Sequence, residues 1–195
     1  MPKEIIFDMD DTICDLCSVF LDRVNTQFDL TIPDYLIYNG FDDYFVKVVD
    51  KDISEEFDKD RMAFKIKYIF NDNFFLNLEP IVGAVEFVNK CNQEGFDISF
   101  LTRVIDWEDH PNQKKEWLQK YFGNLDYELI ITEKLRTKRF FHTANYILDD
   151  SVNVAKELQN VIMPEKSWNR EFIKINNRRS FKSFDELDFI FSDKV

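Results

Sequence analysis

The 195-residue chain is acidic, with a formal net charge of −12, and 45% of its residues are hydrophobic. A chain of this size can bury one core and a small accessory domain. The negative charge argues against nucleic-acid polymers and anionic membranes as partners, because both require a cationic surface. No apolar run approaches the roughly 20 residues that span a bilayer. The N-terminus lacks a basic leader followed by an apolar stretch, so we expect a cytoplasmic protein.

The segment from Glu4 to Thr12 reads as a buried strand that ends in three carboxylates and a hydroxyl. In open α/β sheets, ligands bind beyond the carboxyl ends of the strands, so acids at such an end indicate a site. Asp8 and Asp10 are two residues apart, which in extended backbone places both side chains on one side. Their repulsion requires a cation or a shared proton, and a divalent metal is the simplest relief.

Two helices with an irregular segment between them are expected next. Apolar residues recur at helical spacing over residues 15–28. Residues 31–52 are less regular, and Ser54 then opens an amphipathic helix that ends near residues 71–73. Cys14 and Cys17 form a lone CxxC, which we interpret as helix packing rather than a redox or zinc site, because no second pair completes four ligands.

Strands and helices then alternate along the chain. We expect a helix between Pro80 and Gly95, because proline near the start and glycine past the end frame a helical pattern. The other expected elements are a strand at 97–102, a helix at 110–122, strands at 129–132 and 146–148, and a helix at 151–158. This alternation is typical of a parallel sheet wrapped by helices, and right-handed crossovers bring the strand ends to one edge.

The final strand can be assigned to either of two segments near the end of the chain, residues 161–163 or residues 172–175. Ser183 with Glu186 predicts a capping box for a terminal helix.

The length of the first connection predicts the domain organisation. Between Thr12 and Thr102 lie far more residues than one helix and one strand require. We therefore expect a three-layer, Rossmann-like α/β core in residues 1–16 and 77–195, with a small helical cap, residues 17–76, inserted after the first strand. A cap would exclude water from a reactive intermediate, whereas a packing insertion is the alternative.

The motifs resemble those of the haloacid dehalogenase-type phosphohydrolases. Asp8, Asp10 and Thr12 match the Asp-x-Asp-x-Thr motif after the first strand. The family's later motifs have counterparts in the expected order, each at a strand end or just before a strand: Thr102, Lys138 and the pair Asp149-Asp150. Lys134 and Arg139 are alternatives to Lys138.

The connecting segments resemble the 5'(3')-deoxyribonucleotidase family over nearly the whole chain. The matching residues are 73–75, 78–80, 83–84, 110–112, 115–117, 121–123 and 168–170. Three features depart from the family. Arg103 follows the second-motif threonine, residues 139–148 lack glycine, and residues 17–72 match little. These departures bear on substrate choice more than on catalysis.

The resemblance implies a phosphomonoesterase that depends on Mg²⁺. Asp8 would be the nucleophile and Asp10 the general acid and base. Thr102, Arg103 and Lys138 would bind the phosphate. The metal ligands would be Asp8, Asp149 and the backbone carbonyl of Asp10, with Asp150 acting through water or orienting the loop.

The implied substrate is a deoxynucleoside monophosphate. Phe74 and Phe75, where the cap returns to the core, could offer an exposed ring for the base, although hinge packing is an equal alternative. A sugar phosphate or a 3'-phosphorylated nucleic-acid end is an alternative substrate, because a fold and its catalytic core do not determine the substrate. A metal-binding relative without turnover is the alternative outside enzymes.

Overall fold

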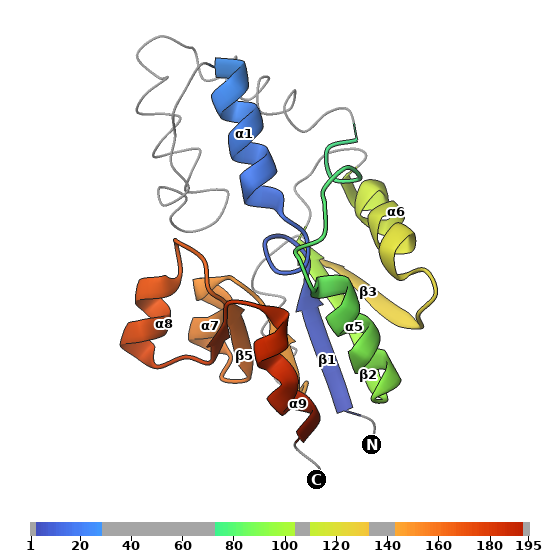
Figure 1. The fold of residues 1–195 in the computed structure, drawn as a ribbon, viewed down its shortest axis with the longest axis vertical. Coiled ribbons are helices and arrows are strands. Elements are labelled where there is room, and N and C mark those ends of the chain that lie inside the picture. The colour runs from blue at the N-terminus through green and yellow to red at the C-terminus, as the bar shows by residue number, and fades with distance from the viewer. Residues whose placement is uncertain (1–2, 29–72, 104–109, 133–142, 193–195) are drawn as a thin grey trace.

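A computed structural model describes residues 3–28, 73–103, 110–132 and 143–192. Within them, six parallel strands form a sheet in the order β3-β2-β1-β4-β5-β6 (Figure 1). The strands are β1 (Lys3–Asp8), β2 (Phe96–Arg103), β3 (Tyr127–Thr132), β4 (Tyr146–Leu148), β5 (Val161–Pro164) and β6 (Ser180–Phe181). The strand order reverses direction at β1, and open α/β sheets form ligand sites at such a switch point.

Among the described residues, helices lie between β1 and β2, β2 and β3, β4 and β5, and β5 and β6, as the alternating pattern predicts. The helices are α1 (Leu16–Phe28), α5 (Ala84–Gln93), α6 (His110–Phe122), α7 (Val152–Glu157), α8 (Arg170–Asn176), the 3₁₀ helix η4 (Phe184–Asp188) and α9 (Phe189–Ser192). At the start of α7, the Ser151 hydroxyl accepts a hydrogen bond from the Val154 amide. The α/β fold with a parallel sheet is therefore confirmed.

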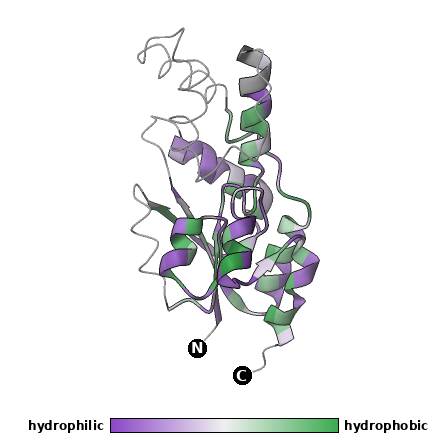
Figure 2. Ribbon diagram, turned by 90° about the vertical axis from the view of Figure 1, so that its left-hand side faces the viewer, coloured by the Kyte–Doolittle hydropathy of each residue, from purple (hydrophilic) through white to green (hydrophobic). Residues whose placement is uncertain are grey.

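The sheet has a buried core on each face, which makes the fold three-layered. Ile5 and Phe7 of β1 belong to one core cluster, together with residues of α5, α6 and α9. Ile6, between them, belongs to a second cluster with residues of α7 and α8. Successive side chains of a strand point to opposite faces, so a strand covered on both faces is apolar throughout its centre. The helices carry both hydrophobic and hydrophilic residues, as expected of a layer between core and solvent (Figure 2).

Three details near the C-terminus correct or complete the sequence analysis. Of the two candidate strands, residues 161–163 lie in β5, and residues 172–175 lie in α8, where Ile175 is 72% exposed. The two-residue edge strand β6 was not predicted. The capping box is wrong, because the Ser183 hydroxyl makes no cap bond and Glu186 accepts its bond from the Lys182 amide, at 3.1 Å.

The structure describes only the two ends of the predicted cap. Helix α1 leaves the carboxyl edge of the sheet, and residues 73–76 return to it (Figure 1). The helix expected after Ser54 lies outside the described residues, so the cap remains a prediction. In the described part of the chain, no helix is both long and apolar enough to cross a membrane.

Candidate active site

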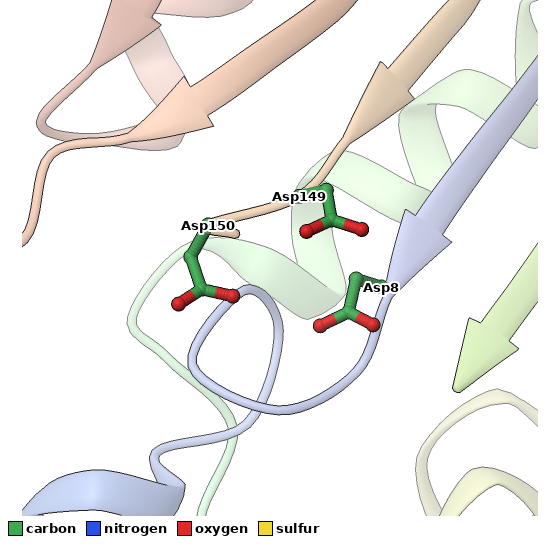
Figure 3. A group of neighbouring side chains, drawn as sticks. All are labelled: Asp8, Asp149 and Asp150. Atoms are coloured by element: carbon green, nitrogen blue, oxygen red, sulfur yellow. The ribbon is translucent and has the colours of Figure 1, made fainter. Parts of the chain in front are cut away.

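Three carboxylates meet at the carboxyl edge of the sheet. Asp8 is the last residue of β1, and Asp149 directly follows β4, the strand beside it. Phe7 pairs with Leu148 in this ladder, so the next residue of each strand reaches the same level. One oxygen from each of Asp8, Asp149 and Asp150 lies within 4.8 Å of the others (Figure 3). Strand register, rather than loop conformation, therefore brings the first two acids together.

Several buried carboxylates lie close enough together at this edge to shift one another's pKa. Burial raises the pKa of Asp150 well above its usual range, and the neighbouring carboxylates of Asp11, Asp8 and Asp149 raise it further. Burial also raises the pKa of Asp11 to about 6. A cation bound among these oxygens would relieve the repulsion, and hard carboxylate oxygens are the donors that Mg²⁺ prefers. The donor set therefore fits the predicted metal.

A loop between β5 and α8 holds Asp150 in this cluster. The Trp168 indole N–H donates to Asp150 Oδ2 at 2.9 Å. Asn169 is completely buried, and its amide donates to the carbonyl oxygens of Asp150, at 3.1 Å, and Pro164, at 2.8 Å. Its Oδ1 accepts a bond from the Lys166 amide. Both the carboxylate and the backbone of Asp150 are thus anchored.

We expect Trp168→Phe to weaken Mg²⁺ binding about tenfold, because residues that orient metal-site carboxylates typically contribute that much to affinity. Mg²⁺ titrations monitored by thermal unfolding measure the change. Trp117→Phe is the matched control, because it removes an indole N–H that donates to the Leu78 carbonyl oxygen at 2.7 Å, away from the acids. The control should lose stability but keep its Mg²⁺ affinity. Equal affinities in the two variants would mean that Trp168 only supports the fold.

A buried lysine links two of the predicted catalytic residues. Lys114 lies in the second turn of α6 and is 1% exposed. Its Nζ donates to Asp10 Oδ2 at 2.6 Å and to the Thr102 hydroxyl. It also contacts the carbonyl oxygen of Arg103, the last residue of β2, at 3.2 Å. Asp10, Thr102 and a cation therefore lie together beside the acid cluster.

Asp10 lies two residues beyond the end of β1, just before a tight turn. Strand β1 ends at Asp8, and the chain then turns back on itself, so that the Asp11 amide donates to the Cys14 carbonyl oxygen at 2.8 Å. Asp11 occupies the left-handed region, with φ of 56°. The Asp10 carboxylate is paired with Lys114 and is not among the three acids whose oxygens lie within 4.8 Å of one another. A metal contact through the Asp10 backbone carbonyl remains a prediction.

The two cysteines of the CxxC do not pack together on one helix, contrary to the expectation from the sequence. Cys14 lies in the turn, before α1 begins, and Cys17 is in the first turn of α1, so the two thiols do not share a helix face. The Cys17 amide donates to Asp11 Oδ1 at 2.8 Å, which fixes the start of α1 to the acidic turn. Burial raises the pKa of both thiols well above the usual range, which disfavours a reactive thiolate.

Lys114 was missed by the sequence reasoning, which assigned the phosphate-binding cation to the segment before β4. Lys114 and Lys115 are adjacent in sequence, and only their places on the amphipathic pattern of α6 distinguish the buried one from the exposed one. The signal that could have identified Lys114 is its place near the start of α6, because the first turns of a helix that follows a strand lie close to the end of that strand. Lys138, Lys134 and Arg139 lie outside the described residues.

Phe74 and Phe75 do not provide the exposed ring that base stacking requires. Their side chains are 0% and 4% exposed, which corrects that expectation. The Phe75 ring stacks on His110, with centroids 3.6 Å apart, and the Phe75 amide donates to Gln113 Oε1 at 3.1 Å. Both partners lie in the first turn of α6, one turn before Lys114. The pair therefore docks the returning chain on the helix that carries the buried lysine.

A parallel sheet with Asp8, Thr102 and Asp149 at its carboxyl edge is the arrangement expected from the resemblance to the haloacid dehalogenase-type phosphohydrolases. A solved structure of this type, a HAD family hydrolase from Deinococcus radiodurans with bound phosphate and sodium, superposes with a TM-score of 0.68. It is 11% identical, and the match covers 98% of this chain and 96% of the other. At this identity the likeness concerns the fold.

The chain belongs to the 5'-nucleotidase family whose model, "5' nucleotidase, deoxy (Pyrimidine), cytosolic type C protein", matches residues 3–193. A human relative, the mitochondrial 5'(3')-deoxyribonucleotidase, is 27% identical over 158 residues, which cover 77% of this chain and 63% of the relative. The mouse mitochondrial 5'(3')-deoxyribonucleotidase is 27% identical over 172 residues, covering 84% and 69%. The predicted resemblance is confirmed at the level of the family.

Proposed function

We propose that this protein is a Mg²⁺-dependent phosphomonoesterase that dephosphorylates deoxynucleoside monophosphates. The observation that supports this most strongly is the arrangement at the sheet edge. Three carboxylates that fit a metal lie near a fourth, Asp10, which is paired with a buried lysine. Family membership supports the nucleotide substrate.

In the first step, a carboxylate oxygen of Asp8 attacks phosphorus in line with the bond to the leaving sugar oxygen. A new O–P bond forms to Asp8 as the P–O bond to the sugar breaks. Asp10 donates its proton to the departing sugar oxygen. The products are the nucleoside and an aspartyl-phosphate at Asp8.

In the second step, Asp10 takes a proton from a water molecule that attacks the same phosphorus. The bond to Asp8 breaks, inorganic phosphate leaves, and both carboxylates return to their starting states. The ion pair with Lys114 holds the Asp10 carboxylate in one place for both proton transfers. A bound Mg²⁺ would offset the charge of the phosphate and of the Asp8 carboxylate that approaches it.

The phosphoryl oxygens need cationic and hydrogen-bonding partners at this edge of the sheet. Thr102 and Lys114 are in contact with each other and lie next to Asp10. We infer that they bind the phosphoryl oxygens, with the lysine countering negative charge in the transition state. Lys138 remains proposed for the same task, and Arg103 contributes at least the carbonyl oxygen that positions Lys114.

Phosphate release from a panel of phosphomonoesters tests the substrate class. The panel contains deoxy- and ribonucleoside 5'- and 3'-monophosphates, sugar phosphates and a short 3'-phosphorylated oligonucleotide. We expect the highest kcat/KM for a deoxynucleoside monophosphate. A higher kcat/KM for a sugar phosphate than for every deoxynucleotide would refute the nucleotidase proposal and retain the phosphohydrolase.

The acid cluster also predicts how Mg²⁺ changes thermal stability. Mg²⁺ should raise the unfolding temperature, because a ligand selective for the native state stabilises it. The pKa values of Asp11 and Asp150 are raised in the folded protein, so these two carboxyls bind protons at a higher pH in the folded state than in the unfolded state. Their contribution to the free energy of unfolding is fully present below the usual carboxyl pKa. It is lost as the pH rises through their folded-state pKa values, and this value is about 6 for Asp11.

The stabilisation by Mg²⁺ should therefore be larger at about pH 7.5 than at about pH 4.5, where protons occupy the site. Calorimetry with Mg²⁺ and with chelator at both pH values measures this difference. Asp149→Ala is the control, and it should reduce the stabilisation by Mg²⁺ at both pH values. An unchanged transition in the wild-type protein would argue against the metal site.

A further inference from the structure

A second anion-binding site is suggested by a cavity of about 460 Å³ at the C-terminal ends of α7 and α8. Its lining includes three cations, Lys156, Arg178 and Arg179, and no acidic residue. This is unusual for a chain with 37 acidic and 25 basic residues. We call this space the basic cavity.

Within the part of the chain that the structure describes, no carboxylate forms a salt bridge with Lys156, Arg178 or Arg179. Among the described residues, the salt bridges are those of Lys90 with Asp188 and Lys114 with Asp10, and neither involves the basic cavity. The Arg178 Nη1 donates to a neutral acceptor, Gln159 Oε1, at 3.0 Å. Three cations facing one space repel one another, so an anion bound there would be favourable.

The remaining lining residues indicate which groups the ligand has in addition to its negative charge. The Phe172 ring is half-buried, packed on the core cluster beneath α7 and α8, and contributes a flat apolar surface. Gln159, Asn176 and Asn177 add side-chain amides, which donate and accept hydrogen bonds. Guanidinium groups suit phosphate oxygens, and an aromatic face suits a planar ring. The volume is within the range of small-molecule sites.

The basic cavity is separate from the acid cluster. Helix α7 begins two residues after Asp150, and α8 begins directly after Asn169, which bonds to Asp150. The cationic lining of the basic cavity lies at the opposite ends of these helices, which span six and seven residues, whereas Phe172 lies in the first turn of α8. Helices of this length are about 10 Å long. One small molecule does not occupy both places.

We propose that the basic cavity is a second binding site that takes a nucleoside phosphate, with the phosphates on Lys156, Arg178 and Arg179 and the base on Phe172. The site is distinct from the one where monophosphates would be hydrolysed. Its ligand therefore does not need to be a substrate, and the site does not depend on the proposed function.

Calorimetric titration of the full chain in chelator, where hydrolysis is prevented, tests this proposal with three probes: deoxyadenosine triphosphate, deoxyadenosine and inorganic tripolyphosphate. We expect the triphosphate to bind more tightly than tripolyphosphate, which lacks the ring, and deoxyadenosine to bind weakest. Arg178→Gln with Arg179→Gln should weaken binding of the triphosphate about tenfold or more, because charge-assisted contacts to phosphate are lost.

The matched control is Lys174→Gln with Lys182→Gln, which removes the same charge from exposed positions nearby that do not line the basic cavity. It should change the affinity less than about twofold, because neither side chain lines the basic cavity and charges that do not contact the ligand are screened by salt. Phe172→Leu should weaken the triphosphate but not tripolyphosphate, and thermal unfolding verifies that each variant is folded. Absence of triphosphate binding, equal weakening in both double variants, or equal affinity for triphosphate and tripolyphosphate would overturn the proposal.

Discussion

Asp8→Asn should reduce phosphate release at least about 1,000-fold while the protein stays folded, because the amide removes the nucleophile without opening a cavity. The change also removes one negative charge from the cluster with Asp149 and Asp150. In chelator, the variant should therefore unfold at the same temperature as the wild-type protein or above it. Steady-state phosphate release, measured beside thermal unfolding, verifies both effects.

A folded Asp8→Asn variant with near-normal activity would refute the covalent mechanism. Asp149→Asn provides the comparison, because it removes a carboxylate of the same cluster that is not the nucleophile. It should lose activity through weakened metal binding, so high Mg²⁺ should restore part of its activity. No Mg²⁺ concentration should rescue Asp8→Asn.

Lys114→Met should reduce kcat/KM about 100-fold or more, because it removes the cation between Asp10 and Thr102. Methionine keeps a similar length and an apolar stem, so the packing of α6 is largely retained. Lys115→Met is the matched control, since Lys115 is the exposed neighbour on the same helix. The control should have near wild-type activity.

The two lysine variants also distinguish between the candidate phosphate-binding cations. If Lys114 both orients Asp10 and binds the phosphoryl group, Lys114→Met should alter the pH profile of kcat as well as its height. Near-normal kcat/KM in Lys114→Met would assign the cation to the segment that holds Lys138. A large loss in Lys138→Met together with an intact Lys114→Met would confirm that assignment.

The sequence predicted those parts of the fold that depend on apolar runs and on the order of the strands along the chain. β1, β2 and β4 are apolar runs followed at once by polar residues, and parallel connections bring such ends together. Asp8 and Asp149 were therefore predictable as neighbours, before any contact between their strands was known. The segment 161–163 could not be separated from 172–175, because short apolar runs suit a strand or a helix equally.

The parts of the site that could not be predicted depend on single turns and on long-range packing. The turn after Asp10 has Asp11 at a positive φ that few non-glycine residues adopt, and the sequence pattern did not predict the pairing of Asp10 with Lys114. Lys114 is buried where the second turn of α6 meets the end of β2, and its contacts there with Thr102 and Arg103 are long-range packing that the amphipathic pattern of α6 does not reveal. The burial of Phe74 and Phe75 depends on their docking against α6, which lies about 35 residues further along the chain.

The Mg²⁺ dependence of phosphate release from a deoxynucleoside monophosphate tests most directly whether the strand-end acids form a metal-dependent phosphohydrolase site. The wild-type protein should be inactive in chelator and gain activity with a saturable dependence on Mg²⁺. Asp149→Ala should shift that dependence to concentrations at least about tenfold higher. Full activity in chelator, or an unshifted Mg²⁺ dependence in Asp149→Ala, would contradict the account.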